Sequence, residues 1–199
     1  MQQLLVATRN RGKLEEIRSL LGNFRINLII PEMIGITLEV EETGSSYEEN
    51  ASLKATAFAR LSGLVTMADD SGLEVDALNG QPGIRSARFS PLLGATDADR
   101  RAYLLSFLQD HPQPWTAHFH CTVAIATPEG SIFYAQGNCP GEIIPSERGE
   151  NGFGYDPIFL IPELGLTMAE LSMDEKNQIS HRARAVKAAL PLVQTILGD

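Results

Sequence analysis

A long alternation of apolar and polar residues in the second half of the chain constrains the fold more than any other feature. From Ala117 to Ile125, apolar side chains occupy every second position, which is the pattern of a β-strand that buries one face. Residues 128–130 (Pro-Glu-Gly) predict a turn, and residues 131–136 can return as an antiparallel strand. The chain must therefore build a sheet that contains at least one β-hairpin.

Helical patterns alternate with shorter apolar runs in the rest of the chain. Ser46 and Thr96 each have an acidic residue three positions later, which is the spacing of a capped helix start, and Gly63 ends the first of these helices. Pro191 predicts a kink or a restart in the last helix. The other expected helices begin at Lys13 and near His181, and the other expected strands span 4–7, 26–30, 64–68, 73–77 and 157–161.

Composition limits the class of protein. The 199 residues are 43% hydrophobic and 21% charged, as in a folded globular protein, and no repeat or linker divides them, so we expect one α/β domain over residues 1–199. The net charge of −9 disfavours a nucleic-acid partner. With no long apolar stretch and only two cysteines, Cys121 and Cys139, we expect no membrane partner and a reducing, cytoplasmic location.

The first candidate site joins the first strand to the first helix. Backbone amides and the positive end of a helix make such a junction suitable for anions, and a lysine adds a full charge. An ordinary polar turn is the alternative. The residues are Thr8, Arg9, Asn10, Arg11, Gly12 and Lys13.

The second candidate is Asp69-Asp70, placed at the carboxyl end of the strand 64–68, where open α/β sheets bind ligands. Neighbouring strand residues point to opposite faces, so the two acids should have different roles. Backed by Glu41 or Glu42, a carboxylate here suits Mg²⁺. The alternative is a turn that caps the strand end.

Two further candidates lie in the last third of the chain. Gly152-Phe153-Gly154-Tyr155-Asp156 offers aromatic rings for stacking on a flat ligand and an acid to accept from ring N–H groups; a structural turn is the alternative. Lys176 with residues 180–182 (Ser-His-Arg) forms a local positive site in an acidic chain, or else a solvated helix end.

Together these segments resemble the inosine triphosphate pyrophosphatase family, whose members are dITP/XTP pyrophosphatases. The resemblance runs almost end to end, and one departure is Arg9, where many relatives carry Gly. The matching stretches are 8–13, 41–44, 49–51, 54–55, 68–73, 82–84, 86–88, 152–159, Lys176 and 179–182.

The resemblance implies an elongated mixed β-sheet flanked by helices, with two lobes around a central cleft, and a homodimer. It implies Mg²⁺-dependent hydrolysis of non-standard purine nucleoside triphosphates to the monophosphate and pyrophosphate. Glu41 and Asp70 would ligate the metal, and Asp70 would also activate water. Among the residues implied to bind substrate, Asn10, Lys13 and Lys54 would hold the triphosphate, Phe153 would stack on the base, and Asp156, Lys176, His181 and Arg182 would surround its edges. The others implied to contact substrate are Thr8, Arg9, Arg11, Gly12, Ser71, Gly154 and Tyr155.

Two other functions remain open at this point. One is a nucleotide-binding module without hydrolysis, which leaves the acidity of Glu41 and Asp70 unexplained, because bare carboxylates repel a triphosphate. The other is a related pyrophosphatase for modified pyrimidine or methylated nucleotides.

Overall fold

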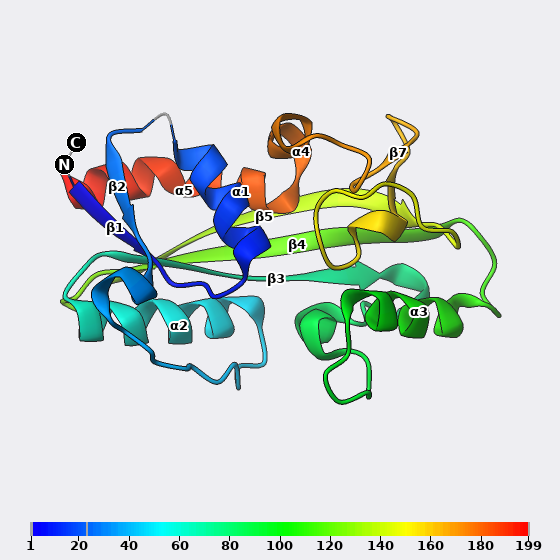
Figure 1. Cartoon of the computed structure of the whole chain (residues 1–199), viewed down its shortest axis with the longest axis horizontal. Helices are drawn as coiled ribbons and strands as arrows, with labels where there is room; N and C mark the ends of the chain where they lie inside the picture. Colours follow the sequence, from blue (N-terminus) through cyan, green and yellow to red (C-terminus); the bar gives the residue numbers. More distant parts are fainter. Residues whose placement is uncertain (1, 23, 199) are drawn as a thin grey trace. The chain divides into compact units, whose positions relative to one another are not determined.

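The computed structural model describes residues 2–22 and 24–198. Within these residues, seven strands form one mixed sheet, in the order β2-β1-β3-β4-β5-β6-β7 (Figure 1). Their bounds are β1 Gln2–Val6, β2 Ile26–Ile29, β3 Thr66–Val75, β4 Trp115–Ala126, β5 Ile132–Ile143, β6 Phe159–Ile161 and β7 Leu166–Thr167. The expected mixed sheet flanked by helices is confirmed.

The described residues also form five α-helices and four short 3-10 turns. The helices are α1 Arg11–Leu21, α2 Tyr47–Ser62, α3 Asp97–Leu108, α4 Met173–Ile179 and α5 His181–Leu197. The 3-10 turns are η1 Pro31–Ile34, η2 Asp76–Leu78, η3 Gly83–Arg88 and η4 Asp156–Ile158.

The chain divides into two compact units. Unit 1 contains residues 1–70, 121–137 and 181–199, and unit 2 contains residues 71–120 and 138–180. Strands β3, β4 and β5 each begin in one unit and end in the other. The single domain and the central cleft stay predictions.

In unit 1, helices cover both faces of the sheet. Strand β1 pairs in parallel with β2 and β3, and its residues alternate between two cores. Leu4 and Val6 join the core with α1 and α5, whereas Leu5 joins the core with Ala55 and Phe58 of α2. Figure 1 shows α2 on the side of the strands opposite α1 and α5. A strand covered on both faces is apolar throughout, which explains the uninterrupted run at the start of the chain.

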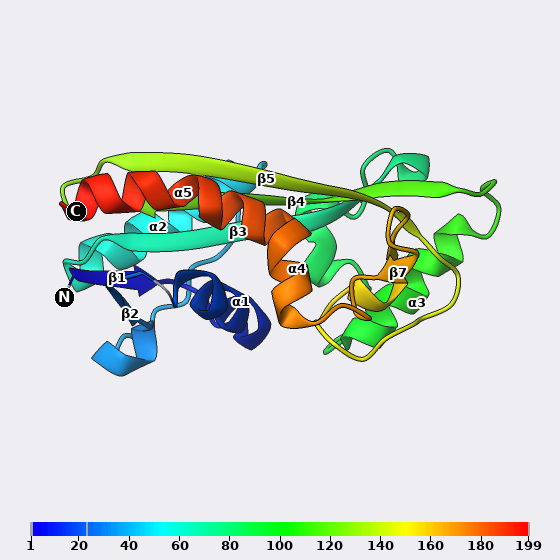
Figure 2. The same cartoon turned by 90° about the horizontal axis from the view of Figure 1, so that it is seen from above.

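In unit 2, short antiparallel strands extend the sheet beyond β5. Strand β6 pairs with β5 and with β7, and α3 buries Leu104 and Leu108 in a core that includes Phe159. Figure 2, turned by 90°, shows α3, β7 and α4 from above. Thr96 and Asp99 form the predicted capping box at the start of α3.

Several predicted boundaries are confirmed and others are wrong. Ser46 caps α2 and Gly63 ends it in the left-handed conformation, at φ +69°. The predicted break after Ala68 is wrong, because β3 runs for ten residues through both aspartates. The predicted restart at Pro191 is also wrong, since α5 is one helix that contains this proline. Helix α4 and strand β7, of seven and two residues, have too little periodicity to be recognised from sequence.

Candidate active site

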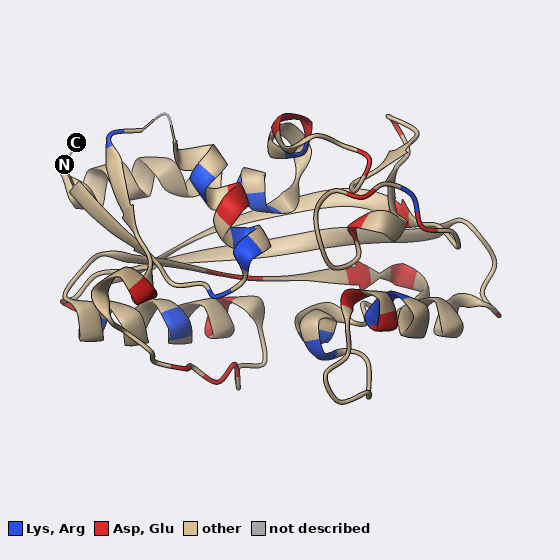
Figure 3. Cartoon of the chain, in the orientation of Figure 1, with Lys and Arg blue, Asp and Glu red and all other residues tan. Residues whose placement is uncertain are grey.

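The two aspartates at the centre of β3 lie on opposite faces of the unit 1 sheet. Asp69 contacts residues of α1 and α5, whereas Asp70 contacts a residue of α2. Figure 3 shows acidic positions in the middle of β3 and basic positions along the helices on either side. The expectation that the two acids point to opposite faces is therefore confirmed, and their different roles stay a prediction.

Asp69 is held by two cations. Its Oδ2 lies 3.0 Å from Lys13 Nζ and 3.3 Å from Arg182 Nε. Burial by itself would raise the pKa of Asp69, but Lys13, Arg182 and Lys54 outweigh it and hold this pKa well below its ordinary value. Asp69 is therefore ionised at neutral pH and anchors the two helices to the sheet.

Glu16 completes this buried cluster and was missed by the sequence analysis. It is 2% exposed and pairs with Arg182, which is 1% exposed. Glu16 lies one helical turn after Lys13, on the face where α1 meets the core. An acid at a helix position that favours an apolar residue was the indication in the sequence that Glu16 has a buried partner. The predicted role of Arg182 at a purine base stays a prediction.

Asp70 has a different set of partners. Asn50, which is fully buried on α2, donates from Nδ2 to Asp70 Oδ2 over 3.0 Å, and its Oδ1 accepts from the backbone N–H of Gly44 over 2.8 Å. Burial, reinforced by the charge of Glu42, raises the pKa of Asp70 despite the nearby Lys54. This combination gives a carboxylate with a fixed orientation and an increased affinity for a proton.

The structure places Glu42 in this cluster, and Glu41 outside it. Lys54 Nζ donates to Glu42 Oε1 over 2.8 Å and to the carbonyl oxygen of Asp69 over 2.6 Å. Glu41 is exposed and contributes its carbonyl oxygen to a local turn with Thr43. Neighbouring acids are not distinguishable by residue type, so only the path of the loop assigns Glu42 to the site.

The donor set around Asp70 fits a hard cation. Asp70 and Glu42 supply carboxylate oxygens, and their mutual repulsion is one cause of the raised pKa of Asp70, which a bound cation would relieve. Within residues 2–22 and 24–198, no group of three or more His, Cys, Asp or Glu is placed to hold a metal ion. Two carboxylates suit Mg²⁺, which keeps several waters and shares its shell with phosphates.

The 8–13 loop forms the start of α1 as predicted, and its side chains have separate tasks. Asn10 caps the helix, because its Oδ1 accepts from the backbone N–H of Lys13 over 3.1 Å. Thr8 Oγ1 accepts from the N–H of Asn10 over 3.2 Å. Arg9 pairs with Glu39, an exposed partner beyond the loop. Arg11 and Gly12 open the first turn, and the binding of phosphate by the loop stays a prediction.

A second cluster, in unit 2, surrounds Phe153. Asp156 Oδ2 accepts from Lys176 Nζ over 2.5 Å and from the N–H of Phe153 over 2.9 Å. Lys176 Nζ also lies 5.2 Å from the centre of the Phe153 ring, in a cation–π arrangement. The tip of this loop is thus organised around a buried ion pair.

The other predicted residues occupy both units. Tyr155 is buried, and its hydroxyl donates to the carbonyl oxygen of Ser86 over 2.9 Å, so its ring packs in unit 2. Burial raises the pKa of this phenol above its ordinary value. Ser71 follows Asp70 on β3, and His181 opens α5. The substrate contacts predicted for these residues, and for Gly154, stay predictions.

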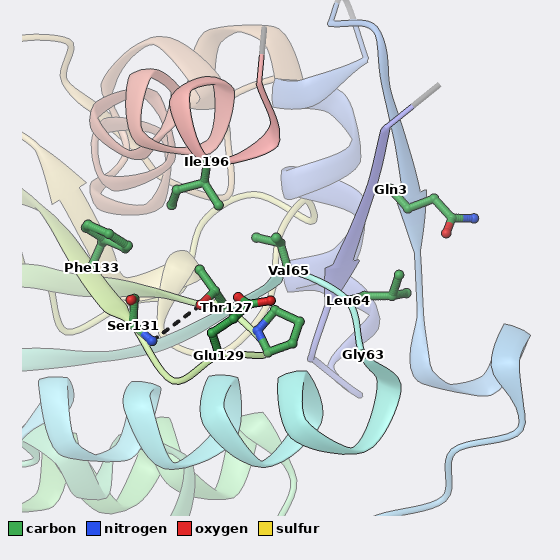
Figure 4. A pocket seen from close by; sticks show the side chains of 10 residues that line it. Gln3, Gly63, Leu64, Val65, Thr127, Glu129, Ser131, Phe133 and Ile196 are labelled. Atoms are coloured by element: carbon green, nitrogen blue, oxygen red, sulfur yellow. Dashed lines mark hydrogen bonds between the residues drawn. The ribbon is translucent and has the colours of Figure 1, made fainter.

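Unit 1 also contains an open cavity of about 700 Å³ away from these clusters. Figure 4 shows Leu64, Val65, Phe133 and Ile196 around it, with Gln3 at one side. No predicted site residue lines this cavity.

Comparisons with known proteins agree on the family. The model of the Ham1 family matches residues 4–192. A dITP/XTP pyrophosphatase of Desulforamulus reducens is 46% identical over 98% of this chain and 96% of its own length. A dITP/XTP pyrophosphatase of Geobacter sulfurreducens is 48% identical over 94% of each chain.

Solved structures show the same architecture. A HAM1 protein from Coxiella burnetii superposes with a TM-score of 0.87 at 40% identity, covering 98% of this chain and 100% of the other. A nucleoside-triphosphatase / dITP/XTP pyrophosphatase from Mycobacterium abscessus gives a TM-score of 0.74 at 43% identity, covering 96% and 100%.

The mixed sheet, the paired acids and these relatives define an enzyme of the hydrolase class. The chain belongs to the Ham1 family. None of the helices in the described part of the chain has the length and apolar character needed to cross a membrane.

Proposed function

We propose that this protein hydrolyses non-standard purine nucleoside triphosphates, namely ITP, dITP, XTP and dXTP, to the nucleoside monophosphate and pyrophosphate. The observation that carries the proposal is the cluster on β3 in unit 1. There Asp70 and Glu42 face Lys54, while Lys13 and the start of α1 lie beside the neighbouring Asp69. The names of the relatives support the same reaction.

The chain's own residues account for the handling of phosphate and water. Lys13 and Lys54 supply positive charge, and Asn10 supports the first turn of α1, where backbone N–H groups suit an anion. Asp70 orients the attacking water and accepts its proton at a carboxylate oxygen. A raised pKa suits this task, because a base is most effective when its pKa approaches the working pH.

Asp70 and Glu42 are the residues that would hold Mg²⁺. When bound, the ion would neutralise phosphate charge and increase the acidity of a coordinated water. The resemblance points to Glu41 as the second ligand, and that assignment stays a prediction. The charge that Glu42 exerts on Asp70 supports the neighbouring acid.

Base recognition is assigned to the second cluster. Phe153 would stack on the purine, and Asp156 and Lys176 would provide polar groups for its edges. The contacts of His181 and Arg182 with the base stay predictions. A site that donates to the 6-oxygen rejects ATP, because a 6-amino group would leave a buried donor unpaired. GTP must be rejected at the 2-position, where hypoxanthine carries hydrogen and xanthine carries oxygen.

The remaining features of the proposal follow the resemblance. We expect a cytoplasmic homodimer without a nucleic-acid or membrane partner, and the net charge of −9 agrees with the absence of nucleic acid. A binding module without hydrolysis is less well supported, because the acidic pair of Asp70 and Glu42 would only weaken its affinity for a triphosphate.

The test is a turnover panel. Purified protein is incubated with Mg²⁺ and either ITP, dITP, XTP, GTP, ATP or a modified pyrimidine triphosphate, and the products are separated. We expect pyrophosphate and monophosphate from ITP, dITP and XTP, and little product from GTP or ATP. Release of single phosphates, or preference for a pyrimidine, would contradict the proposal.

A further inference from the structure

Helix α3 holds both polar groups of the backbone of Gly154, the residue after Phe153. Asp97 Oδ2 accepts from the N–H of Gly154 over 2.8 Å, and Arg101 Nη1 donates to its carbonyl oxygen over 2.8 Å. Asp97 and Arg101 lie one helical turn apart on α3, so both point to the same side. One loop residue is thus fixed at two points by one helix.

Arg101 is itself held in place. Its Nε and Nη2 donate to the two carboxylate oxygens of Glu147, over 2.9 and 2.8 Å, and its side chain is only 12% exposed. A bidentate pair of this kind restricts the planar guanidinium more than a single contact would. The donor that reaches Gly154 therefore has a defined position.

The loop around Phe153 needs external support. Gly152 and Gly154 have φ of +75° and +62°, a left-handed conformation that glycine adopts easily. Because glycine has many accessible conformations in the unfolded chain, ordering this segment costs conformational entropy. Asp156 accepts from the N–H of Phe153. The two contacts from α3 hold the next residue, Gly154.

We propose that Asp97 and Arg101 are positioning residues for purine binding, which keep the Phe153 ring in place as a preformed platform for the base. The inference rests on the proposed role of Phe153. A ring that is already ordered loses little freedom when a ligand stacks on it, so preorganisation increases affinity without any contact between α3 and the ligand.

The experiment measures two ligands on the full-length protein. Binding of inosine monophosphate and of pyrophosphate is determined separately by calorimetry, with Mg²⁺, for the wild type, Asp97→Asn and Arg101→Gln. We expect the Kd for inosine monophosphate to rise about five- to tenfold and the Kd for pyrophosphate to change less than about twofold. Hydrogen exchange of the backbone amides at 152–156 should become faster in both variants.

Asp99→Asn is the matched control. Asp99 accepts from the N–H and hydroxyl of Thr96 over 2.7 and 2.6 Å, so its loss weakens the cap of the same helix without touching Gly154. We expect a lower melting temperature and an unchanged Kd for inosine monophosphate. If the Kd for inosine monophosphate rises in this control as much as in Arg101→Gln, the effect comes from the stability of the helix, and the inference is overturned.

Phe153→Ala separates this inference from the proposed function. If Phe153→Ala leaves the Kd for inosine monophosphate unchanged, the proposed base site fails and the inference fails with it. If Phe153→Ala weakens binding but Asp97→Asn and Arg101→Gln do not, only the positioning inference is overturned. Equal loss of pyrophosphate binding in the two α3 variants would also overturn it.

Discussion

At the residue scale, the unit 1 site depends on two adjacent carboxylates with opposite pKa shifts. Lysine and arginine hold the pKa of Asp69 down, whereas burial and Glu42 raise that of Asp70. Since the two side chains leave opposite faces of one strand, each takes its character from a different helix layer. Asp69 anchors two helices, and Asp70 is the proposed base.

Asp70→Asn should reduce turnover of ITP by about 10²–10⁴-fold, because it removes the proposed base. The melting temperature without metal should stay equal or rise. The pKa of Asp70 is higher in the folded state than in the unfolded chain, where it is about 3.9. Protonated Asp70 therefore stabilises the fold at low pH, this contribution is lost as the pH rises, and at pH 7 the charged side chain lowers the free energy of unfolding. Product release and thermal melting check both expectations, and near wild-type turnover would contradict the mechanism.

Arg182→Ala should destabilise the protein by about 3–5 kcal/mol, because it leaves the buried carboxylates of Glu16 and Asp69 without their shared partner. Urea unfolding measures the loss. Arg184→Ala, at an exposed position on the same helix, is the control and should stay within about 0.5 kcal/mol. An unchanged unfolding free energy for Arg182→Ala would show that the buried cluster contributes little.

At the element scale, Asn50 links α2, the loop that carries Glu42, and β3. Its amide group donates to Asp70 and accepts from Gly44, so one side chain relates the positions of both proposed metal ligands. A Cβ at Gly44 would lie 2.6 Å from Glu49 Cβ and 2.8 Å from Asn50 Oδ1. The glycine is therefore needed for this close approach.

Gly44→Ala and Asn50→Ala should each reduce turnover, by about tenfold or more, since a small misplacement of catalytic groups is costly. Because both changes disrupt one link, the double variant should be little worse than either single variant. Kinetics of the three variants provide the measurement, with Ser52→Ala on α2 as the control. Fully multiplicative losses would show that the two residues act independently.

At the scale of the whole molecule, the free energy of unfolding should depend on pH in the acid range. The pKa of Asp69 lies below its unfolded value, so its contribution is present above a pH of about 4 and is lost as the pH falls further. The free energy of unfolding in urea should therefore decrease toward pH 3. Asp69→Asn should be less stable at pH 7 and should show a smaller decrease. Equal slopes in the two proteins would exclude Asp69 as a source of acid sensitivity.

The sequence by itself determined the hairpin, the start and end of α2 and the start of α3, because periodicity and capping are local properties. Tertiary structure decided the rest. It extended β3 through both aspartates, placed Glu42, one of the two candidate acids, beside Lys54, and paired Arg182 with Glu16. These outcomes depend on which charges meet in the folded chain, and residues as distant in sequence as Glu16 and Arg182 carry no local pattern that relates them.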